Sequence, residues 1–314
     1  MIPADNLFMI LGFLFASYSV IANDSVQTLG TFIASNSRKY KWYTLWLATS
    51  SILIITLVIG WYLNGGDISY GRLDSIPLAE TFKWYHALAP LTLVFLTRFG
   101  IPVSTTFLVL SIFAPSAVLE DMLIKSFLGY SVAMVVAFVS WKVLSTFFNE
   151  YSPVNKVNEK FWVVIQWVTT AILWSTWLSH DLANIAVFLP RELSAYWMMT
   201  CILVLVIGLG YMFYNKGGRI QNIVLEKTST RYVRSATIID FFYALILLVF
   251  REISNVPMST TWVFVGLLAG REFAISHPNN GESNLKTVFP IVAKDFSKMM
   301  VGLAASIAIV LLAT

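Results

Sequence analysis

The chain has 314 residues, of which 57% are hydrophobic and 12% charged, with a net charge of +4 and a mean hydropathy of +0.73. A soluble domain carries about twice that fraction of charge, so the composition excludes an independent soluble domain and predicts an integral membrane protein. The single cysteine, Cys201, excludes an intrachain disulfide and a multi-thiolate metal site.

Six apolar runs are each long enough to cross a bilayer as an α-helix, which needs about 20 residues. In chain order, these runs cover residues 7–34, 42–63, 120–148, 160–189, 194–214 and 287–313. We therefore predict an all-α integral membrane protein that lies in the lipid bilayer of the cell membrane or inner membrane.

Two further apolar stretches, residues 82–118 and 236–275, are each interrupted by a proline and by the triplet Ser-Thr-Thr. Pro102 and Pro257 come just before the triplets, where a proline fits a turn or the start of a helix. We predict that each stretch forms a re-entrant hairpin of two short helices, because broken backbone at membrane depth is tolerated only where it lines a buried cavity. The alternative is a kinked helix that crosses the membrane.

The charges of the loops predict how the two halves are oriented. The loop before the first hairpin has a net charge of −2, whereas the loop before the second has a net charge of +4. The charged residues are Asp67, Arg72, Asp74 and Glu80 in the first loop and Lys216, Arg219, Glu226, Lys227, Arg231 and Arg234 in the second. Because positive loops face the cytoplasm, the two loops lie on opposite sides and both termini are extracytoplasmic.

The second half is therefore expected to be inverted relative to the first. Residues 1–155 and 156–314 would each form one repeat of about three transmembrane helices plus one re-entrant hairpin, and both repeats would belong to one membrane domain. The positive charge of the chain lies mainly in the loop before the second hairpin and in the loop with Arg38, Lys39 and Lys41. It needs no nucleic acid partner.

Two acidic residues, Asp24 and Asp181, lie inside apolar runs and are 157 residues apart. An ionised carboxylate at membrane depth costs at least about 2.5–3.5 kcal/mol, so such residues usually face a cavity and serve a function. Gln27 and Asn184 each follow an acid by three residues, which puts carboxylate and amide on one helix face. With Asn23, these oxygen ligands suit a hard cation such as sodium. The alternative is an acid that pairs with Lys or Arg to hold helices together.

The triplets Ser104-Thr105-Thr106 and Ser259-Thr260-Thr261 follow the two acids by 80 and 78 residues. If each triplet opens the second helix of a hairpin, its N–H groups and hydroxyls lie at the positive end of a helix dipole, where anions bind. Two such ends would hold a tetrahedral oxyanion between them, with Asp24 and Asp181 close by. A single triplet could simply pack helices together, but the matching offsets favour a substrate site shared by both halves.

These motifs resemble those of the inorganic phosphate transporter family, whose sodium- or proton-coupled carriers include a sulfate permease branch. Its members repeat Gly-Ala-Asn-Asp-x-x-Asn and Pro-x-Ser-Thr-Thr-His in both halves. The corresponding segments here are Ile21-Ala22-Asn23-Asp24-Ser25-Val26-Gln27, Pro102-Val103-Ser104-Thr105-Thr106-Phe107, Leu178-Ser179-His180-Asp181-Leu182-Ala183-Asn184 and Pro257-Met258-Ser259-Thr260-Thr261-Trp262. The stretch from Gly217-Gly218-Arg219 to Glu226-Lys227 is also similar to the cytoplasmic segment of that family.

The chain departs from the family pattern around the triplets. Ile21 replaces a Gly, Gln27 replaces the last Asn of the first acidic motif, and His180 replaces the Asn before the second Asp. Both motif histidines are replaced, by Phe107 and Trp262. The resemblance therefore supports an oxyanion substrate more strongly than it supports phosphate in particular.

Three further residues are weaker candidates. His180 could couple transport to protons by titrating near neutral pH, or it could be a neutral replacement for Asn. Arg98 and Arg251 precede the two triplets at similar offsets. Their guanidinium groups could bind a tetrahedral anion, or they could be held by a neighbouring acid such as Glu252.

We therefore predict a secondary active transporter, not an enzyme, which imports phosphate by symport with sodium or protons through alternating access. No cofactor is expected, apart from sodium as a co-substrate. Sulfate or another tetrahedral oxyanion is the alternative substrate. An anion channel and an intramembrane hydrolase with paired aspartates are alternatives of other classes. The sequence leaves the oligomeric state open, and a homodimer is one alternative.

Overall fold

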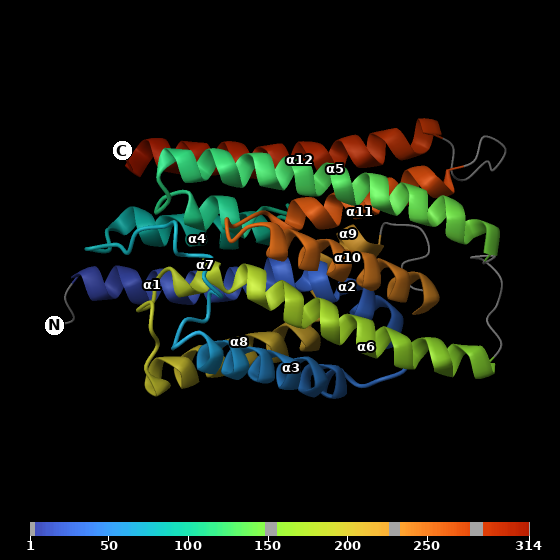
Figure 1. Cartoon of the computed structure of the whole chain (residues 1–314), viewed down its shortest axis with the longest axis horizontal. Helices are drawn as coiled ribbons and strands as arrows, with labels where there is room; N and C mark the ends of the chain where they lie inside the picture. The colour runs from blue at the N-terminus through green and yellow to red at the C-terminus, as the bar shows by residue number, and fades with distance from the viewer. Residues whose placement is uncertain (1–3, 148–155, 226–232, 277–284, 314) are drawn as a thin grey trace.

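The structure is a computed structural model that describes residues 4–147, 156–225, 233–276 and 285–313, and every regular element in these ranges is helical (Figure 1). The elements are α1 (Ala4–Ser19), the π-helical turn η1 (Val20–Asp24), α2 (Ser25–Asn36), α3 (Trp42–Leu63), α4 (Trp84–Arg98), the π-helical turn η2 (Thr106–Leu110), α5 (Ser116–Phe147), α6 (Lys156–Asp181), α7 (Ala183–Ala186), α8 (Ala195–Tyr214), α9 (Gln221–Leu225), α10 (Val233–Ile253), α11 (Thr260–Ile275) and α12 (Leu285–Ala313). The loop residues Glu226, Lys227 and Arg231 and the predicted repeat boundary at residue 155 lie outside the described ranges.

Within the residues that the structure describes, seven helical segments are long and apolar enough to cross a membrane, judged by length and composition. They are Asn6–Asn36, Trp42–Leu63, Ser116–Leu144, Glu159–Ala186, Ala195–Tyr214, Val233–Ile253 and Leu285–Ala313. Six of them match the predicted runs, and the chain is an integral membrane protein. The seventh is α10, which has 21 residues against 15 in α4. It is therefore longer than the short hairpin arm that the sequence predicts.

Four helical segments are interrupted near the middle of the bundle, at the positions of the predicted motifs. In the first half, η1 separates α1 from α2, and residues 99–105 separate α4 from η2. In the second half, Leu182 separates α6 from α7, and residues 254–259 separate α10 from α11. Gly100 has a φ of 71°, which glycine adopts readily, and the prolines before the triplets cannot continue a helix. π-Helical turns of this kind are frequent at functional sites.

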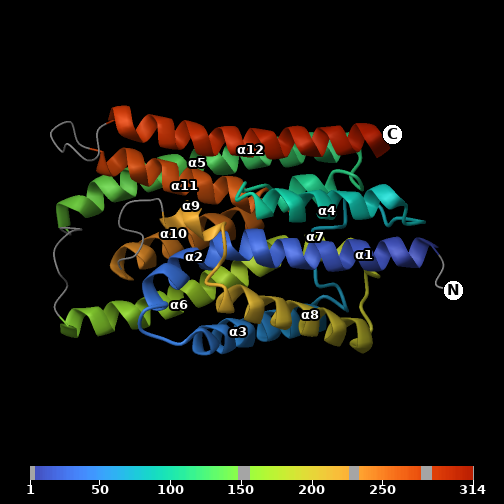
Figure 2. The ribbon, with the colours of Figure 1, turned by 180° about the vertical axis from the view of Figure 1, so that it is seen from behind.

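The chain reverses direction between α10 and α11, and the two helices pack against each other (Figures 1 and 2). The elements of the two halves also contact each other crosswise. α11 packs along α5, the last helix of the first half, and η2 packs against α12, the last helix of the second half. α1 begins and α12 ends at the same end of the molecule. The inverted relation of the two halves, and the side of the membrane on which the termini lie, stay predictions.

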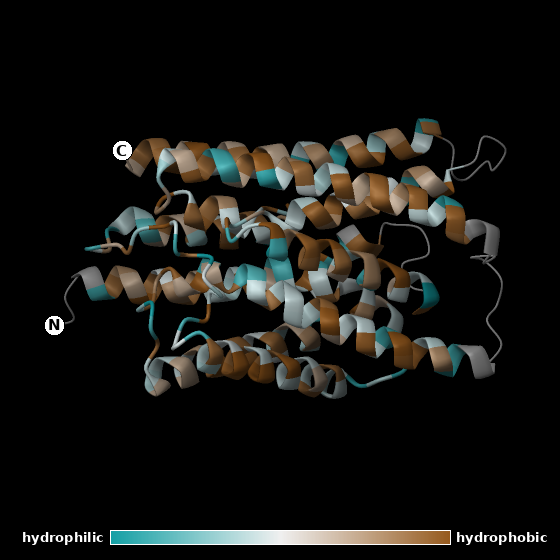
Figure 3. Cartoon of the chain, viewed as in Figure 1, coloured by the Kyte–Doolittle hydropathy of each residue, from teal (hydrophilic) through white to brown (hydrophobic). Residues whose placement is uncertain are grey.

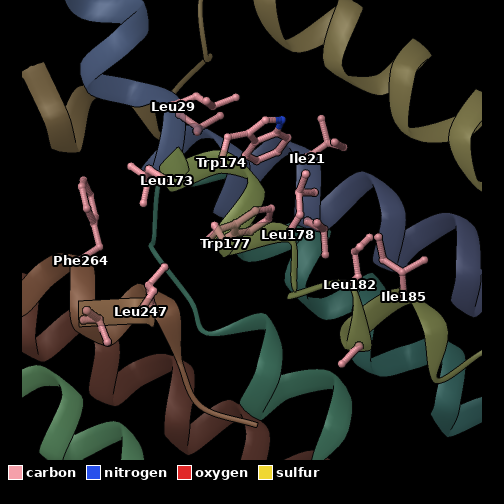
Figure 4. Close-up of a cluster of buried hydrophobic side chains, with 14 of the residues drawn as sticks. Ile21, Leu29, Leu173, Trp174, Trp177, Leu178, Leu182, Ile185, Leu247 and Phe264 are labelled. Atoms are coloured by element: carbon pink, nitrogen blue, oxygen red, sulfur yellow. The ribbon is translucent and has the colours of Figure 1, made fainter. Parts of the chain in front are cut away.

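The hydrophobic core surrounds the breaks in the helices and carries side chains from η1, α2, α6, α7, α10 and α11 (Figure 4). Trp174 and Trp177 stack at its centre, with ring centroids 5.0 Å apart and an interplanar angle of 6°. Trp174 Nε1 donates a hydrogen bond of 3.0 Å to the carbonyl of Thr49 in α3, and Trp177 Nε1 donates one of 3.2 Å to Thr260 Oγ1. The apolar core therefore also positions a hydroxyl of the second triplet.

α5 and α11 approach closely because α11 presents two glycines, four residues apart, to the backbone of α5. A Cβ atom added to Gly266 would lie 2.3 Å from the carbonyl oxygen of Tyr130. One added to Gly270 would lie 2.0 Å from the carbonyl oxygen of Met134. Small residues at this spacing allow membrane helices to pack tightly.

We expect Gly270→Ala to destabilise the protein by about 1–3 kcal/mol or more, because overpacking of a tight interface has this cost and a backbone atom cannot move aside as a side chain can. The thermal unfolding midpoint in detergent measures the effect. Gly129→Ala on α5 is the matched control, because a Cβ atom there meets the Val263 methyl group at 3.0 Å. Equal midpoints for the two variants would contradict this account of the interface.

Candidate functional site

The breaks in the helices bring the motifs of both halves together in the middle of the bundle, where hydrophilic residues lie among hydrophobic ones (Figure 3). The two predicted hairpin tips are in contact, because Thr106 Oγ1 donates a hydrogen bond of 3.3 Å to the carbonyl of Met258, the residue before Ser259. The structure therefore places both triplets in one region.

Asp24 is 2% exposed and is connected to both tips. Its Oδ1 accepts hydrogen bonds from Asn23 Nδ2 at 2.7 Å and from Thr261 Oγ1, in the second triplet, at 3.3 Å. Asn23 Nδ2 also donates to the carbonyl of Val103 in the first tip, at 2.6 Å. Gln27 Nε2 donates to Asn23 Oδ1 at 3.1 Å. The π-helical turn and the first turn of α2 thus hold three of the predicted cation ligands together.

Asp181 is 1% exposed and is also connected to both tips. Thr260 Oγ1 donates to Asp181 Oδ2 at 2.7 Å, and Asn184 Nδ2 donates to Asp181 Oδ1 at 3.0 Å. Asn184 Nδ2 also lies 3.4 Å from Thr106 Oγ1, in the first triplet. Each acid therefore contacts a hydroxyl of the second triplet directly and reaches the first tip through an amide. The sequence does not reveal these bonds between acids and triplets, because they depend on where the hairpin tips lie.

Four buried oxygen atoms of the predicted site residues have no hydrogen-bond partner of good geometry within the part of the chain that the structure describes. They are Asp24 Oδ2, Gln27 Oε1, Thr105 Oγ1 and Asn184 Oδ1. A buried polar atom without a partner costs about 1–3 kcal/mol, and such atoms in native proteins call for an explanation such as an unseen ion. Three of the four can only accept hydrogen bonds or coordinate a cation. These carboxylate and amide oxygens are therefore of the type that binds a hard cation.

The two serines of the triplets have the same local role. Ser259 is the N-cap of α11, and its Oγ accepts a hydrogen bond of 3.3 Å from Trp262 N–H. Ser104 Oγ accepts one of 3.2 Å from Phe107 N–H. Capping satisfies only one of the first four N–H groups of a helix. At α11, a helix of 16 residues, the positive dipole end thus begins at the second triplet.

His180 lies beside a residue that sequence reasoning did not select, Arg72. The Nε2 atom of His180 is 2.9 Å from the carbonyl of Leu247 and 3.4 Å from Arg72 Nη2. Arg72 Nε donates a hydrogen bond of 2.9 Å to the carbonyl of Ser179. Burial lowers the pKa of Arg72 to about 10, so the guanidinium remains charged at neutral pH. A protonated His180 would be repelled by this charge, and its role in proton coupling stays a prediction.

Neither Arg98 nor Arg251 forms a hydrogen bond with the triplets in the described ranges. Arg251 lies over the ring of Tyr70, 5.2 Å from its centroid. Arg98 ends α4, where its carbonyl accepts a hydrogen bond of 2.9 Å from Arg219 Nη1. Both Arg98 and Arg219 line a cavity of about 600 Å³, which is bounded by α1, η1, the end of α4, the end of α8 and residues 217–220.

A third buried acid, Asp240 in α10, is also missing from the residues predicted from the sequence. It is completely buried, and its two carboxylate oxygens accept hydrogen bonds of 2.5 Å from Thr31 Oγ1 and Thr170 Oγ1. The rule that selects Asp24 and Asp181, an acid within an apolar stretch, would also have selected Asp240. It joins α2, α6 and α10, and both of these hydrogen bonds come from threonines outside the triplets.

No protein-family model matches the sequence, and no curated protein matches it. Among solved structures, a sodium-dependent phosphate transporter is similar to this chain, with a TM-score of 0.65, 16% sequence identity and coverage of 97% of both chains. A likeness at this identity, over the whole of both chains, shows a common architecture. The chain therefore has the fold of that transporter.

Proposed function

We propose that the protein is a secondary active transporter that imports a tetrahedral inorganic oxyanion, phosphate first, by symport with sodium ions or protons. The observation that carries this proposal is the joining of two buried acids to two Ser-Thr-Thr triplets in one site. The fold of a sodium-dependent phosphate transporter supports it. Import of an anion into a negative interior needs co-transported cations, since each charge costs about 2.3 kcal/mol per 100 mV.

The proposed cation ligands are the acidic motifs, and the proposed anion ligands are the triplets. Asp24 Oδ2 and Gln27 Oε1 have no partner in the described structure, and with Asn23 they form one cation set. Asp181 and Asn184 form the second. The anion would be held by the hydroxyl of Thr105 and by N–H groups at the start of α11, where a negative charge is favoured.

Phosphate is favoured over sulfate because carboxylates lie within the anion site. The second triplet is in direct contact with both acids, through Thr260 and Thr261. A phosphate that keeps a proton can donate a hydrogen bond to a carboxylate, whereas sulfate cannot. Sulfate would place its charge beside two acids without such a bond, and this repulsion makes it the second candidate.

Alternating access would be achieved by movement of one repeat against the other around this site. The cavity beside η1 would then be the path between the site and one side of the membrane. Its lining includes Arg98 and Arg219, so its electrostatic field would attract an anion. Residues 1–155 and 156–314 are the proposed moving units.

Competition for uptake tests the proposed substrate. Purified protein in liposomes is expected to take up labelled phosphate when an inward sodium or proton gradient is imposed. Unlabelled phosphate should suppress the signal, and an equal concentration of sulfate should suppress it much less. Equal competition by the two anions would favour a general oxyanion carrier. Uptake that follows the membrane potential without any cation gradient would favour an anion channel.

A further inference from the structure

Arg72 is a buried cation without a directly bound acid. It comes from the loop between α3 and α4 and is 1% exposed. Among the residues that the structure describes, its hydrogen-bonding neighbours are the carbonyl of Ser179 and the imidazole of His180, and Nη1 has no partner. These neighbours are neutral. A buried charge is strongly destabilising unless an opposite charge compensates it.

The compensating charge is Asp181. Ser179 and His180, which Arg72 contacts, directly precede Asp181 at the end of α6, so the guanidinium is held beside that carboxylate. Arg72 and Asp181 act on each other electrostatically. The two oxygens of Asp181 accept hydrogen bonds from the neutral groups of Thr260 and Asn184. The hydrogen-bond donors to Asp181 are therefore neutral, and Arg72 acts on it as a positive charge.

The other half of the site is different. In the described part of the chain, no hydrogen bond from a lysine or arginine reaches Asn23, Asp24 or Gln27. Asp24 Oδ2 and Gln27 Oε1 also lack partners. In the Asp181 half, Asn184 Oδ1 also lacks a partner, but both carboxylate oxygens of Asp181 are hydrogen-bonded. Asp181 thus has satisfied oxygens and a fixed positive charge beside it, whereas Asp24 has a carboxylate oxygen free to bind a cation.

We propose that Arg72 is the resident counter-charge of Asp181, so that a coupling cation binds only at the Asp24 half of the site. This inference rests on the proposed function and narrows its cation ligands to Asn23, Asp24 and Gln27. Two aspartates and one arginine carry a net charge of −1, instead of −2 for two aspartates alone. The protein then takes up one cation fewer per anion than a site without Arg72.

The number of bound sodium ions tests this inference. Binding of ²²Na⁺ to the purified full chain is measured to saturation, with and without phosphate. Arg72→Gln is expected to bind one more sodium ion per molecule than the wild type, because Asp181 then needs a cation. Arg72→Lys keeps the charge and should bind the wild-type number. Arg191→Gln is the matched control, since Arg191 is a half-buried arginine bonded to the carbonyl of Ile76, outside the site.

An unchanged sodium number in Arg72→Gln would overturn the inference. So would loss of phosphate binding in Arg72→Gln at every sodium concentration, if Arg72→Lys still binds, because Arg72 would then have to contact the anion itself. If Arg72→Gln does not fold, Arg72→Gln combined with Asp181→Asn removes both charges and should fold with the wild-type sodium number. If the double variant does not fold either, Arg72 is a structural residue, and the inference is contradicted.

The same sodium-binding experiment also tests the proposed function, through the effect of phosphate on the wild type. In the wild type, phosphate should strengthen sodium binding. If it does not, the proposed symport fails, while the difference between Arg72→Gln and Arg72→Lys still decides the role of Arg72. If protons replace sodium, the same difference of one ion is read from proton uptake with a pH indicator.

Discussion

Asp24→Asn and Asp181→Asn are each expected to reduce uptake of phosphate against its gradient by about a hundredfold or more. Removing one partner of a buried charge interaction typically costs about 3–5 kcal/mol. Asp24→Asn removes the negative charge from the proposed cation ligands. Asp181→Asn removes the acceptor of Thr260 and leaves Arg72 without its counter-charge. Asparagine keeps the shape of the side chain, so Asp24→Asn should fold normally, whereas Asp181→Asn should also lower the unfolding midpoint because it leaves the buried charge of Arg72 uncompensated.

Accumulation of labelled phosphate in liposomes measures this effect, with the unfolding midpoint as a check of folding. Asp121→Asn makes the same change at an exposed acid in α5 and should transport normally. If Asp24→Asn and Asp181→Asn both still concentrate phosphate, the two acids hold helices together and do not couple transport.

Thr105→Val is expected to raise the phosphate concentration for half-maximal uptake roughly ten- to a hundredfold. The hydroxyl of Thr105 has no partner of good geometry in the described structure. It is therefore available to donate to the anion, and a hydrogen bond to a charged group contributes about 1.5–3 kcal/mol. The dependence on sodium or protons should change less than in Thr260→Val, because Thr105 acts on Asp24 but makes no hydrogen bond of good geometry with it in the described structure. Valine has nearly the same volume as threonine, so folding should be preserved.

Thr260→Val should behave differently, although the repeated motif alone suggests equal effects in the two halves. The hydroxyl of Thr260 already donates to Asp181 and accepts from Trp177 Nε1. Its loss leaves Asp181 Oδ2 unsatisfied, so the cation dependence and the thermal stability should change together with the substrate constant. Uptake rates of Thr105→Val and Thr260→Val, measured over a range of phosphate at several sodium concentrations, test this difference. Equal effects on substrate and none on cation dependence would show that the Thr260–Asp181 bond has no role in coupling.

The spanning helices could be predicted from the sequence because a bilayer requires long apolar runs, which are local features. In the described residues, six of the seven candidate spans match runs predicted by this rule. The position of Pro257 near the middle of residues 236–275 predicts a short helix before it. This helix, α10, in fact begins at Val233 and runs for 21 residues before the break.

The candidate site could be predicted only in part. Duplication identified the acids and the triplets, because a repeated motif is visible in the sequence. In the sequence, Arg72 is only one charge of a loop, since nothing local shows that the loop between α3 and α4 enters the core. The bonds of Thr260 and Thr261 to the acids depend on how α11 packs against the rest of the bundle, and no spacing along the chain specifies this.

Gradient-driven accumulation in liposomes tests the central claim most directly. Wild-type protein is reconstituted with equal phosphate on both sides, and a sodium gradient or a proton gradient is then imposed separately. The proposed symport predicts that one of these gradients raises internal phosphate above external phosphate, and that collapsing the gradient with an ionophore releases it. Phosphate that only equilibrates under every gradient would contradict the account.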